Sequence, residues 1–320
     1  ELARRRLAFE ELFYLAVGLS FLKRRRDQEG AGRAVPVRPR EEFLALLPFA
    51  PTSAQSRVMD EVAKDMVSGR PMNRLVQGDV GSGKTAVAAF AGWLCVRGGF
   101  QAALMAPTEV LAEQHFRSLS RLLSPAGARV GLLTGSMKPS EKKKIQTALA
   151  EGEIDFVVGT HALISQAVAF HNLALIVADE QHRFGVAQRA ALAGKSGKGI
   201  SPHVLVMSAT PIPRTLALII YGDLDISVID QLPPGRTPVS TYVVREDKRQ
   251  RMYGFVRRQV AEGRQAYIIC PAVEENPDAA LPGEETPSLN LKAVKTYAGR
   301  LQKEVFPDLR LGILHGKMKP

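Results

Sequence analysis

The sequence has few cysteines, histidines and aromatic residues, and it has no long apolar run. Only two cysteines and six histidines occur in 320 residues. Cys95 and Cys270 lie far apart without CxxC or Cys/His spacing, which gives no support to a zinc site and predicts reduced thiols in a cytoplasmic protein. The apolar stretch at residues 12–22 is about eleven residues long, whereas a membrane span needs about 18 or more. We therefore expect no membrane span.

Basic charge is what the sequence has in excess. The chain carries 43 Lys and Arg against 32 Asp and Glu, a net charge of +11. Residues 1–40 alone hold ten basic and five acidic side chains. This balance is compatible with a polyanionic partner but does not establish one, because basic runs are often only solvated faces.

The N-terminal region repeats apolar residues at helical spacing. The stripe consists of Phe9, Leu12, Leu15 or Ala16, Leu19 and Leu22. One apolar stripe predicts a helix that packs on the body of the protein. A signal peptide is the rival interpretation, but Glu10 and Glu11 interrupt its apolar core and the basic run 23–26 replaces the small residues of a cleavage site.

From residue 74 onward, short apolar runs alternate with longer helical stretches, which predicts an α/β fold with a doubly wound parallel sheet. The expected strands are 74–77, 101–106, 130–133, 156–158, 173–178 and 204–207, with helices such as 110–123 and 138–151 between them. Prolines and a glycine in residues 231–238 predict a linker. The expected divisions are 1–45 (N-terminal helix and basic linker), 46–232 (first lobe) and 233–320 (partial second lobe, with strands 239–244, 265–270 and 311–314 and helices 247–262 and 291–305).

A complete GxxxxGK[ST] phosphate loop follows the strand expected at 74–77 and opens an alanine-rich helix. Backbone N–H groups of such a loop wrap around phosphate oxygens, so a nucleoside triphosphate site is predicted. Its residues are Gly78, Asp79, Val80, Gly81, Ser82, Gly83, Lys84 and Thr85. Lys84 has the charge for the β and γ phosphates, and the Thr85 hydroxyl suits Mg²⁺. A glycine-rich turn without a ligand is the alternative, which the strand-then-helix context disfavours.

Two acids end the apolar run 175–178. Asp179 is expected to hold the metal, and Glu180 to orient and deprotonate the attacking water. An ordinary acidic strand end is the alternative, and the phosphate loop upstream weakens it.

The motif Asp179-Glu180-Gln181-His182, followed by Ser208-Ala209-Thr210, resembles the helicases and translocases of superfamily 2. The loops 106–109, 133–135 and 159–161 resemble the nucleic-acid-binding motifs of that superfamily, which grip phosphates through hydroxyls and N–H groups. The resemblance implies a catalytic set of Lys84, Asp179, Glu180, Gln181 and His182. It implies nucleic-acid contact or coupling by Pro107, Thr108, Thr134, Gly135, Gly159, Thr160, His161, Ser208 and Thr210.

Within this superfamily, residues 78–85, 179–189 and 207–216 are similar to the RecG-type helicases, which reverse replication forks and migrate branches. The resemblance covers nearly the whole chain. It implies a RecA-like helicase fold, ATP and Mg²⁺ as cofactors, double-stranded and branched DNA as substrates, and single-strand-binding protein as a candidate partner. The sequence does not determine the oligomeric state, for which we favour a monomer. Gln55, after residues 47–49, resembles the residue that contacts the adenine edge in that family.

The RecG-type pattern also extends beyond this sequence. It includes a wedge domain before the first helix here, and an arginine motif and a translocation element after residue 320. We therefore expect a chain truncated at both ends, without junction specificity and with weak ATP hydrolysis, since such an arginine contributes about 10³–10⁵ in turnover.

Three alternatives remain at this point. The translocase that couples transcription to repair shares residues 183–186 and 210–215, but has a second Glu in place of Gln181. A nucleotide-regulated binding module is disfavoured by Lys84 and Glu180, because binding alone needs no water-activating acid. An RNA helicase would carry the same motifs.

Overall fold

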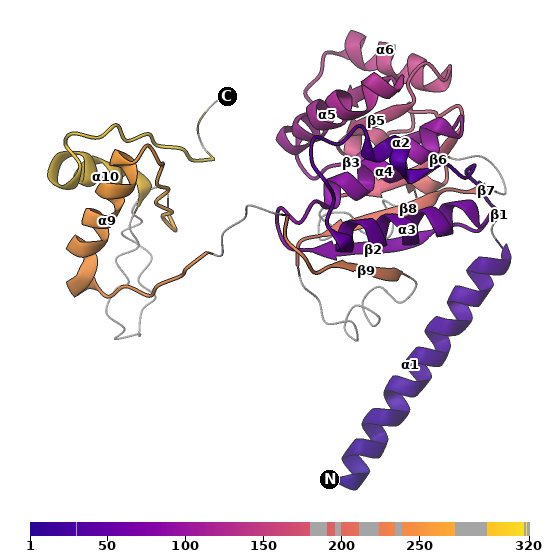
Figure 1. Ribbon diagram of the computed structural model, residues 1–320, viewed down its shortest axis with the longest axis horizontal. Coiled ribbons are helices and arrows are strands. Elements are labelled where there is room, and N and C mark those ends of the chain that lie inside the picture. The colour runs from indigo at the N-terminus through magenta and orange to yellow at the C-terminus, as the bar shows by residue number, and fades with distance from the viewer. Residues whose placement is uncertain are drawn as a thin grey trace. The chain divides into compact units, whose positions relative to one another are not determined.

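The computed structural model forms two compact units, Glu1–Thr237 and Pro238–Pro320. The first contains a parallel sheet with its helices, and the second a small helical cluster (Figure 1). The structure describes residues 1–29, 31–179, 191–195, 200–210, 224–233, 239–272, 293–316 and 318.

Seven parallel strands form the sheet of the first unit, in the order β4-β5-β3-β6-β8-β2-β9. They are β2 (Asn73–Gly78), β3 (Gln101–Met105), β4 (Val130–Leu133), β5 (Phe156–Gly159), β6 (Leu173–Ala178), β8 (His203–Ser208) and β9 (Asp225–Ile229). Six of them lie where the sequence predicts strands. The seventh, β9, was missed because its short run contains Asp225 and Ser227 and stands just before the proline-rich linker.

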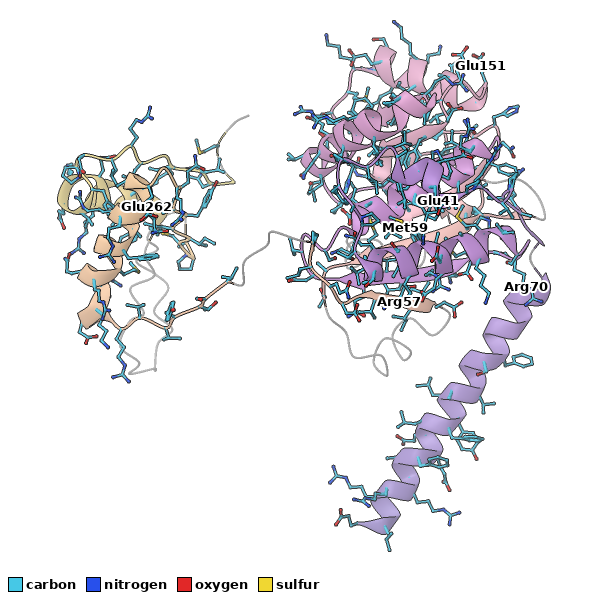
Figure 2. The ribbon with its side chains drawn as sticks, in the orientation of Figure 1. Glu41, Arg57, Met59, Arg70, Glu151 and Glu262 are labelled. Atoms are coloured by element: carbon cyan, nitrogen blue, oxygen red, sulfur yellow. The ribbon has the colours of Figure 1, made fainter. Side chains whose placement is uncertain are left out.

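Helices cover both faces of this sheet (Figure 1). The longer ones are α3 (Ser53–Val67), α4 (Lys84–Arg97), α5 (Glu109–Leu123) and α6 (Pro139–Ala150). Along β3, Ala102 and Leu104 enter one buried cluster, while Ala103 enters another. Figure 2 labels Met59 and Arg57 on α3, of which Met59 is buried and Arg57 is not. The prediction of a doubly wound parallel sheet is confirmed.

Helix α1 (Leu2–Glu29) forms as predicted, but the described side chains of its apolar stripe, from Phe9 to Ala16, are not buried. Phe9 and Leu12 are 67% and 55% exposed, and side chains project along the helix in Figure 2. Phe13 and Tyr14 are exposed as well. The docking of this helix on the body of the protein therefore stays a prediction. Among the described residues, no helix is both long and apolar enough to cross a membrane.

A buried histidine fastens the segment before α2 (Arg40–Leu44) to the sheet. His203 is fully buried at the start of β8. Its Nδ1 accepts a hydrogen bond from the Met72 N–H at 3.0 Å, and its Nε2 donates to the Arg33 carbonyl at 2.8 Å. Both contacts require a neutral ring with its proton on Nε2. Burial lowers the pKa of His203 below its ordinary value.

Acidification should therefore destabilise the first unit. The unfolded chain titrates His203 near its ordinary pKa of 6.5, whereas the folded chain does so at a lower pH. Between those two values the unfolded chain binds more protons, so stability is complete above about pH 6.5 and declines as the pH falls through the window below it. In urea titrations across that window, the free energy of unfolding should fall less steeply for His203→Gln than for the wild type. Equal slopes would contradict this role of His203.

The second unit is built from helices. They are α9 (Arg249–Ala261), α10 (Val294–Arg300) and the π-helix η5 (Leu301–Val305). Tyr253, Leu301 and Phe306 form its core, and the Tyr253 and Tyr297 hydroxyls hydrogen-bond at 2.7 Å. The helix predicted at 247–262 is confirmed by α9, whereas the helix predicted at 291–305 is shared between α10 and η5.

The three strands predicted for the second unit do not form in its described residues. Stretches 239–244, 265–270 and 311–314 carry no strand pairing. A strand needs a neighbour for its N–H and C=O groups, and the described pairing in this unit is a single bridge between Ala272 and Ala293. Val243 and Ile269 accordingly stand 98% and 92% exposed. Apolar, β-branched composition was therefore insufficient to predict pairing.

Candidate nucleotide and nucleic-acid site

The motifs predicted from the sequence follow strands that end at one edge of the sheet. Because all seven strands are parallel, their carboxyl ends lie together, where open α/β sheets bind ligands. The phosphate loop follows β2, Asp179 follows β6, and Ser208 ends β8. Residues 106–109, 134–135 and 160–161 follow β3, β4 and β5. The sheet order thus separates the strands that precede the predicted nucleotide residues (β6, β8, β2) from those that precede the predicted nucleic-acid loops (β4, β5, β3). We call these two groups the nucleotide side and the nucleic-acid side.

The phosphate loop has the backbone that close wrapping requires. Gly81 and Gly83 adopt φ of +78° and +87°, a region that side-chain-bearing residues rarely enter. A Cβ on Gly83 would also overlap the Gln55 side-chain amide. Helix α4 begins directly afterwards at Lys84, so its N-terminal N–H groups face the loop.

The side chains of the loop fit a triphosphate. The Lys84 Nζ donates to the carbonyls of Gly78 and Asp79 at 2.7 and 3.0 Å, which holds the ammonium across the loop. The Ser82 hydroxyl is buried and has no hydrogen-bond partner among the described residues. A buried hydroxyl without a partner costs about 1–3 kcal/mol, which a phosphate oxygen would relieve.

Gln55, predicted to contact adenine, lies under the phosphate loop. It is 1% exposed. Its Oε1 accepts from the Thr52 N–H at 2.9 Å in a capping box, and its Nε2 donates to the Ser82 carbonyl at 2.7 Å. Gln55 thus supports the loop from α3, and adenine contact stays a prediction.

Asp179 stands at the carboxyl end of β6 with its main chain fixed by the sheet. Its N–H donates to the Met105 carbonyl of β3 at 2.9 Å. Its side-chain Oδ2 lies 2.6 Å from Nε2 of His115, which comes from α5. The other predicted catalytic residues beyond it, Glu180, Gln181 and His182, lie outside the described residues.

Sequence reasoning missed His115. A signal for it exists, because Ala112, His115, Leu119 and Leu123 are the buried residues of α5. A histidine in an otherwise apolar helical stripe needs a polar partner. The sequence offered no way to identify that partner, which lies 64 residues away.

Thr85 and Asp179 were predicted as metal ligands. Thr85 is the second residue of α4, after the β2 loop, and strand β8 lies between β2 and β6. No cluster of three or more His, Cys, Asp or Glu suited to a metal occurs in the described part of the chain. Mg²⁺ does not need one, since it is commonly bound through one or two carboxylates, substrate phosphates and water. The residue types at this edge therefore fit a nucleotide-bound Mg²⁺.

On the nucleic-acid side, two predicted loops are tied together. Thr108 caps α5 by accepting from the Leu111 N–H at 3.3 Å. Glu109 Oε1 accepts from the Ser136 N–H at 2.8 Å, next to Gly135. Hydrogen bonding from Ser136 is the main reason that the pKa of Glu109 is lowered. The loop containing Pro107 and the loop containing Gly135 are thereby held beside each other.

Thr134 and Thr160 are buried. These residues are 4% and 3% exposed, and Thr160 Oγ1 has no hydrogen-bond partner among the described residues. The Thr160 N–H donates to the Leu133 carbonyl at 3.3 Å. The preceding Gly159 is required here, because a Cβ would overlap that same carbonyl oxygen. His161 begins a short 3₁₀ helix, η2 (His161–Ile164).

The last predicted loop, Ser208–Thr210 at the end of β8, is hydrogen-bonded to β2, the strand that precedes the phosphate loop. The Thr210 N–H donates to the Ser208 hydroxyl at 3.2 Å, and the Gln77 side chain donates to the Thr210 carbonyl at 3.1 Å. Gln77 directly precedes the phosphate loop, so Ser208–Thr210 and that loop share a physical connection.

Residues 52–219 match the family described as DEAD/DEAH box helicase. The chain belongs to the DEAD/DEAH box helicases. This helicase chain is 50% identical to the ATP-dependent DNA helicase RecG of Synechocystis sp. over 99% of its own length and 37% of the relative's. It is 47% identical to the RecG of Thermotoga maritima, over 99% of this chain and 39% of that one.

Among solved structures, this DEAD/DEAH box helicase is similar to RecG bound to a three-way DNA junction. The TM-score is 0.73 at 47% identity, covering 83% of this chain and 36% of that one. The predicted RecG resemblance and the RecA-like fold are confirmed. The chain spans about two fifths of the length of the curated relatives named here.

Proposed function

We propose that this chain is the motor part of an ATP-dependent DNA helicase that moves on double-stranded and branched DNA, as in fork reversal and branch migration. One observation carries the proposal: the phosphate loop, Asp179 and three nucleic-acid motifs meet at one edge of one sheet. The identity to RecG helicases along nearly the whole chain supports the choice of DNA.

On the nucleotide side, the chain's groups bind and orient a triphosphate. The Lys84 ammonium and the α4 N-terminus attract the phosphates, and the buried Ser82 hydroxyl supplies another contact. Thr85 and Asp179 would hold Mg²⁺, which when bound neutralises charge that develops on the phosphates. Glu180 is proposed to take the proton from the attacking water.

On the nucleic-acid side, the loops after β3, β4 and β5 are proposed to grip phosphates. Glu109 joins two of these loops, so they would bind as one surface. The net charge of +11 is compatible with such a polyanionic partner. The Gln77–Thr210 contact connects the loop at the end of β8, whose Ser208 and Thr210 are proposed coupling residues, with the strand that precedes the phosphate loop.

Duplex DNA should raise ATP turnover by this chain, and duplex RNA should not. Stimulation is expected because the loop surface and the phosphate loop belong to one sheet edge, and the preference for DNA over RNA rests on the identity to the RecG DNA helicases. The measurement is steady-state ATP hydrolysis with no nucleic acid, single strands, duplex DNA, forked DNA and duplex RNA.

DNA binding should also weaken with salt. In a plot of the logarithm of the binding constant against the logarithm of the salt concentration, the slope should be about −0.9 per phosphate neutralised.

The ATP hydrolysis assay also separates the alternatives. Equal stimulation by RNA would favour an RNA helicase. ATP binding with turnover that no nucleic acid changes would favour a nucleotide-regulated binding module. Binding of RNA polymerase by the chain would favour the transcription-repair coupling translocase.

A further inference from the structure

His115 touches the carboxylate proposed to hold the metal, although it belongs to a helix on the nucleic-acid side. Its Nε2 lies 2.6 Å from Asp179 Oδ2, and the two side chains are only 11% and 16% exposed. An ionised carboxylate can only accept, so Nε2 donates. A charge-assisted hydrogen bond that is this short and this sheltered from water fixes the direction of the acceptor.

The main chain of Asp179 is already fixed, so His115 acts on the side chain. Met105 of β3 pairs with Ala178 of β6, and the Asp179 N–H donates to the Met105 carbonyl. What the sheet leaves adjustable is the rotation of the carboxylate. The contact with His115 limits that rotation and occupies one of the two carboxylate oxygens.

Helix α5 carries His115 and the nucleic-acid loop together. The helix is capped by Thr108, and Glu109 in its first turn is bonded to Ser136 of the neighbouring loop. His115 follows Thr108 by seven positions, which is about 10 Å along a helix axis. A helical segment this short moves as one body, so a shift of the loop also shifts the imidazole.

We propose that His115 is a positioning residue that orients the Asp179 carboxylate for the metal. Through His115, the orientation of that carboxylate would also depend on the position that α5 takes when nucleic acid binds. The proposal rests on the proposed function and adds a residue outside the motif residues named above. In metal sites, hydrogen-bond partners of the ligating groups commonly change metal affinity by about 10–100-fold. A change of that size is expected here.

The test compares two substitutions in the whole chain. His115→Gln keeps an N–H donor at a similar reach, whereas His115→Leu fills the same buried position without a donor. We expect the leucine variant to need about 10–100-fold more Mg²⁺ for half-maximal binding of a fluorescent ATP analogue. The glutamine variant should stay close to the wild type, and analogue binding in EDTA should be unchanged in both. The exposed His171→Ala serves as the matched control.

A second readout addresses the link to nucleic acid. Duplex DNA should shift the Mg²⁺ concentration needed for half-maximal analogue binding in the wild type and in His115→Gln. The shift should be smaller in His115→Leu. Thermal unfolding of each variant shows whether it is folded, and His115→Met replaces the leucine variant if that one is not.

The possible failures are distinguishable. The role of His115 is overturned if His115→Gln and His115→Leu need the same Mg²⁺ concentration for half-maximal analogue binding, whether or not that concentration equals the wild-type value. Equal DNA-induced shifts in the two variants overturn the link through α5. A wild-type chain that binds no Mg²⁺–ATP overturns the proposed function, and this inference with it.

Discussion

Lys84→Ala should lower the affinity of the chain for Mg²⁺–ATP by roughly 30-fold or more, with an equal or larger loss of turnover. The Lys84 ammonium is placed over the loop by the Gly78 and Asp79 carbonyls. Removing one partner of a close charge pair in a binding site costs about 2–5 kcal/mol, which corresponds to roughly 30-fold to several-thousand-fold in affinity. Calorimetric titration with ATP and Mg²⁺ measures the loss directly.

Two comparisons give this prediction its meaning. Lys144→Ala removes an exposed lysine from α6 and should leave ATP affinity unchanged. Glu180→Gln should retain ATP binding while turnover falls by about 10²–10⁴-fold, the usual contribution of a general base. Similar losses of binding in Lys84→Ala and Glu180→Gln would contradict the division of roles between the phosphate loop and the acid.

The sequence predicted well those parts of the fold that depend on consecutive residues or on burial of a strand on both faces of the sheet. The phosphate loop could be recognised because eight consecutive residues carry its chemistry, and its glycines do adopt positive φ. Six strands could be located because burial on both faces requires continuous apolar runs. Parallel pairing then brings the carboxyl ends of those strands to one edge, whereas the order of the strands in the sheet was not predicted.

What the sequence could not supply depends on contacts across long separations. The pairing of His115 with Asp179, and of Gln55 with Ser82, joins residues on different elements. Exposure of α1 could not be foreseen either, because spacing shows where a stripe lies and not whether anything covers it. The same limit explains the second unit, where apolar runs near Val243 did not pair as strands.

Gly159→Ala should destabilise the first unit and weaken nucleic-acid binding more than ATP binding. A Cβ at Gly159 would overlap the Leu133 carbonyl oxygen and would come within 2.9 Å of Leu163 Cγ. Because the first of these is a backbone atom between paired strands, a rotamer change cannot relieve it. Overpacking of this kind costs about 1–3 kcal/mol or somewhat more, which should lower the melting temperature by roughly 3–10 °C in a unit of this size.

The overlap at Gly159 lies between β4 and β5, and this position is why we expect nucleic-acid binding to be weakened more than ATP binding. The Leu133 carbonyl also accepts from the Thr160 N–H, so displacement of β4 from β5 moves the two loops proposed to grip phosphates. The nucleotide side is separated from this pair by β3. Gly18→Ala, where nothing lies within 4 Å of the added Cβ, is the matched control and should be neutral or gain up to about 1 kcal/mol of helix stability. If Gly159→Ala melted like the wild type, or lost ATP affinity as much as DNA affinity, the close approach of these strands would not be what positions the nucleic-acid loops.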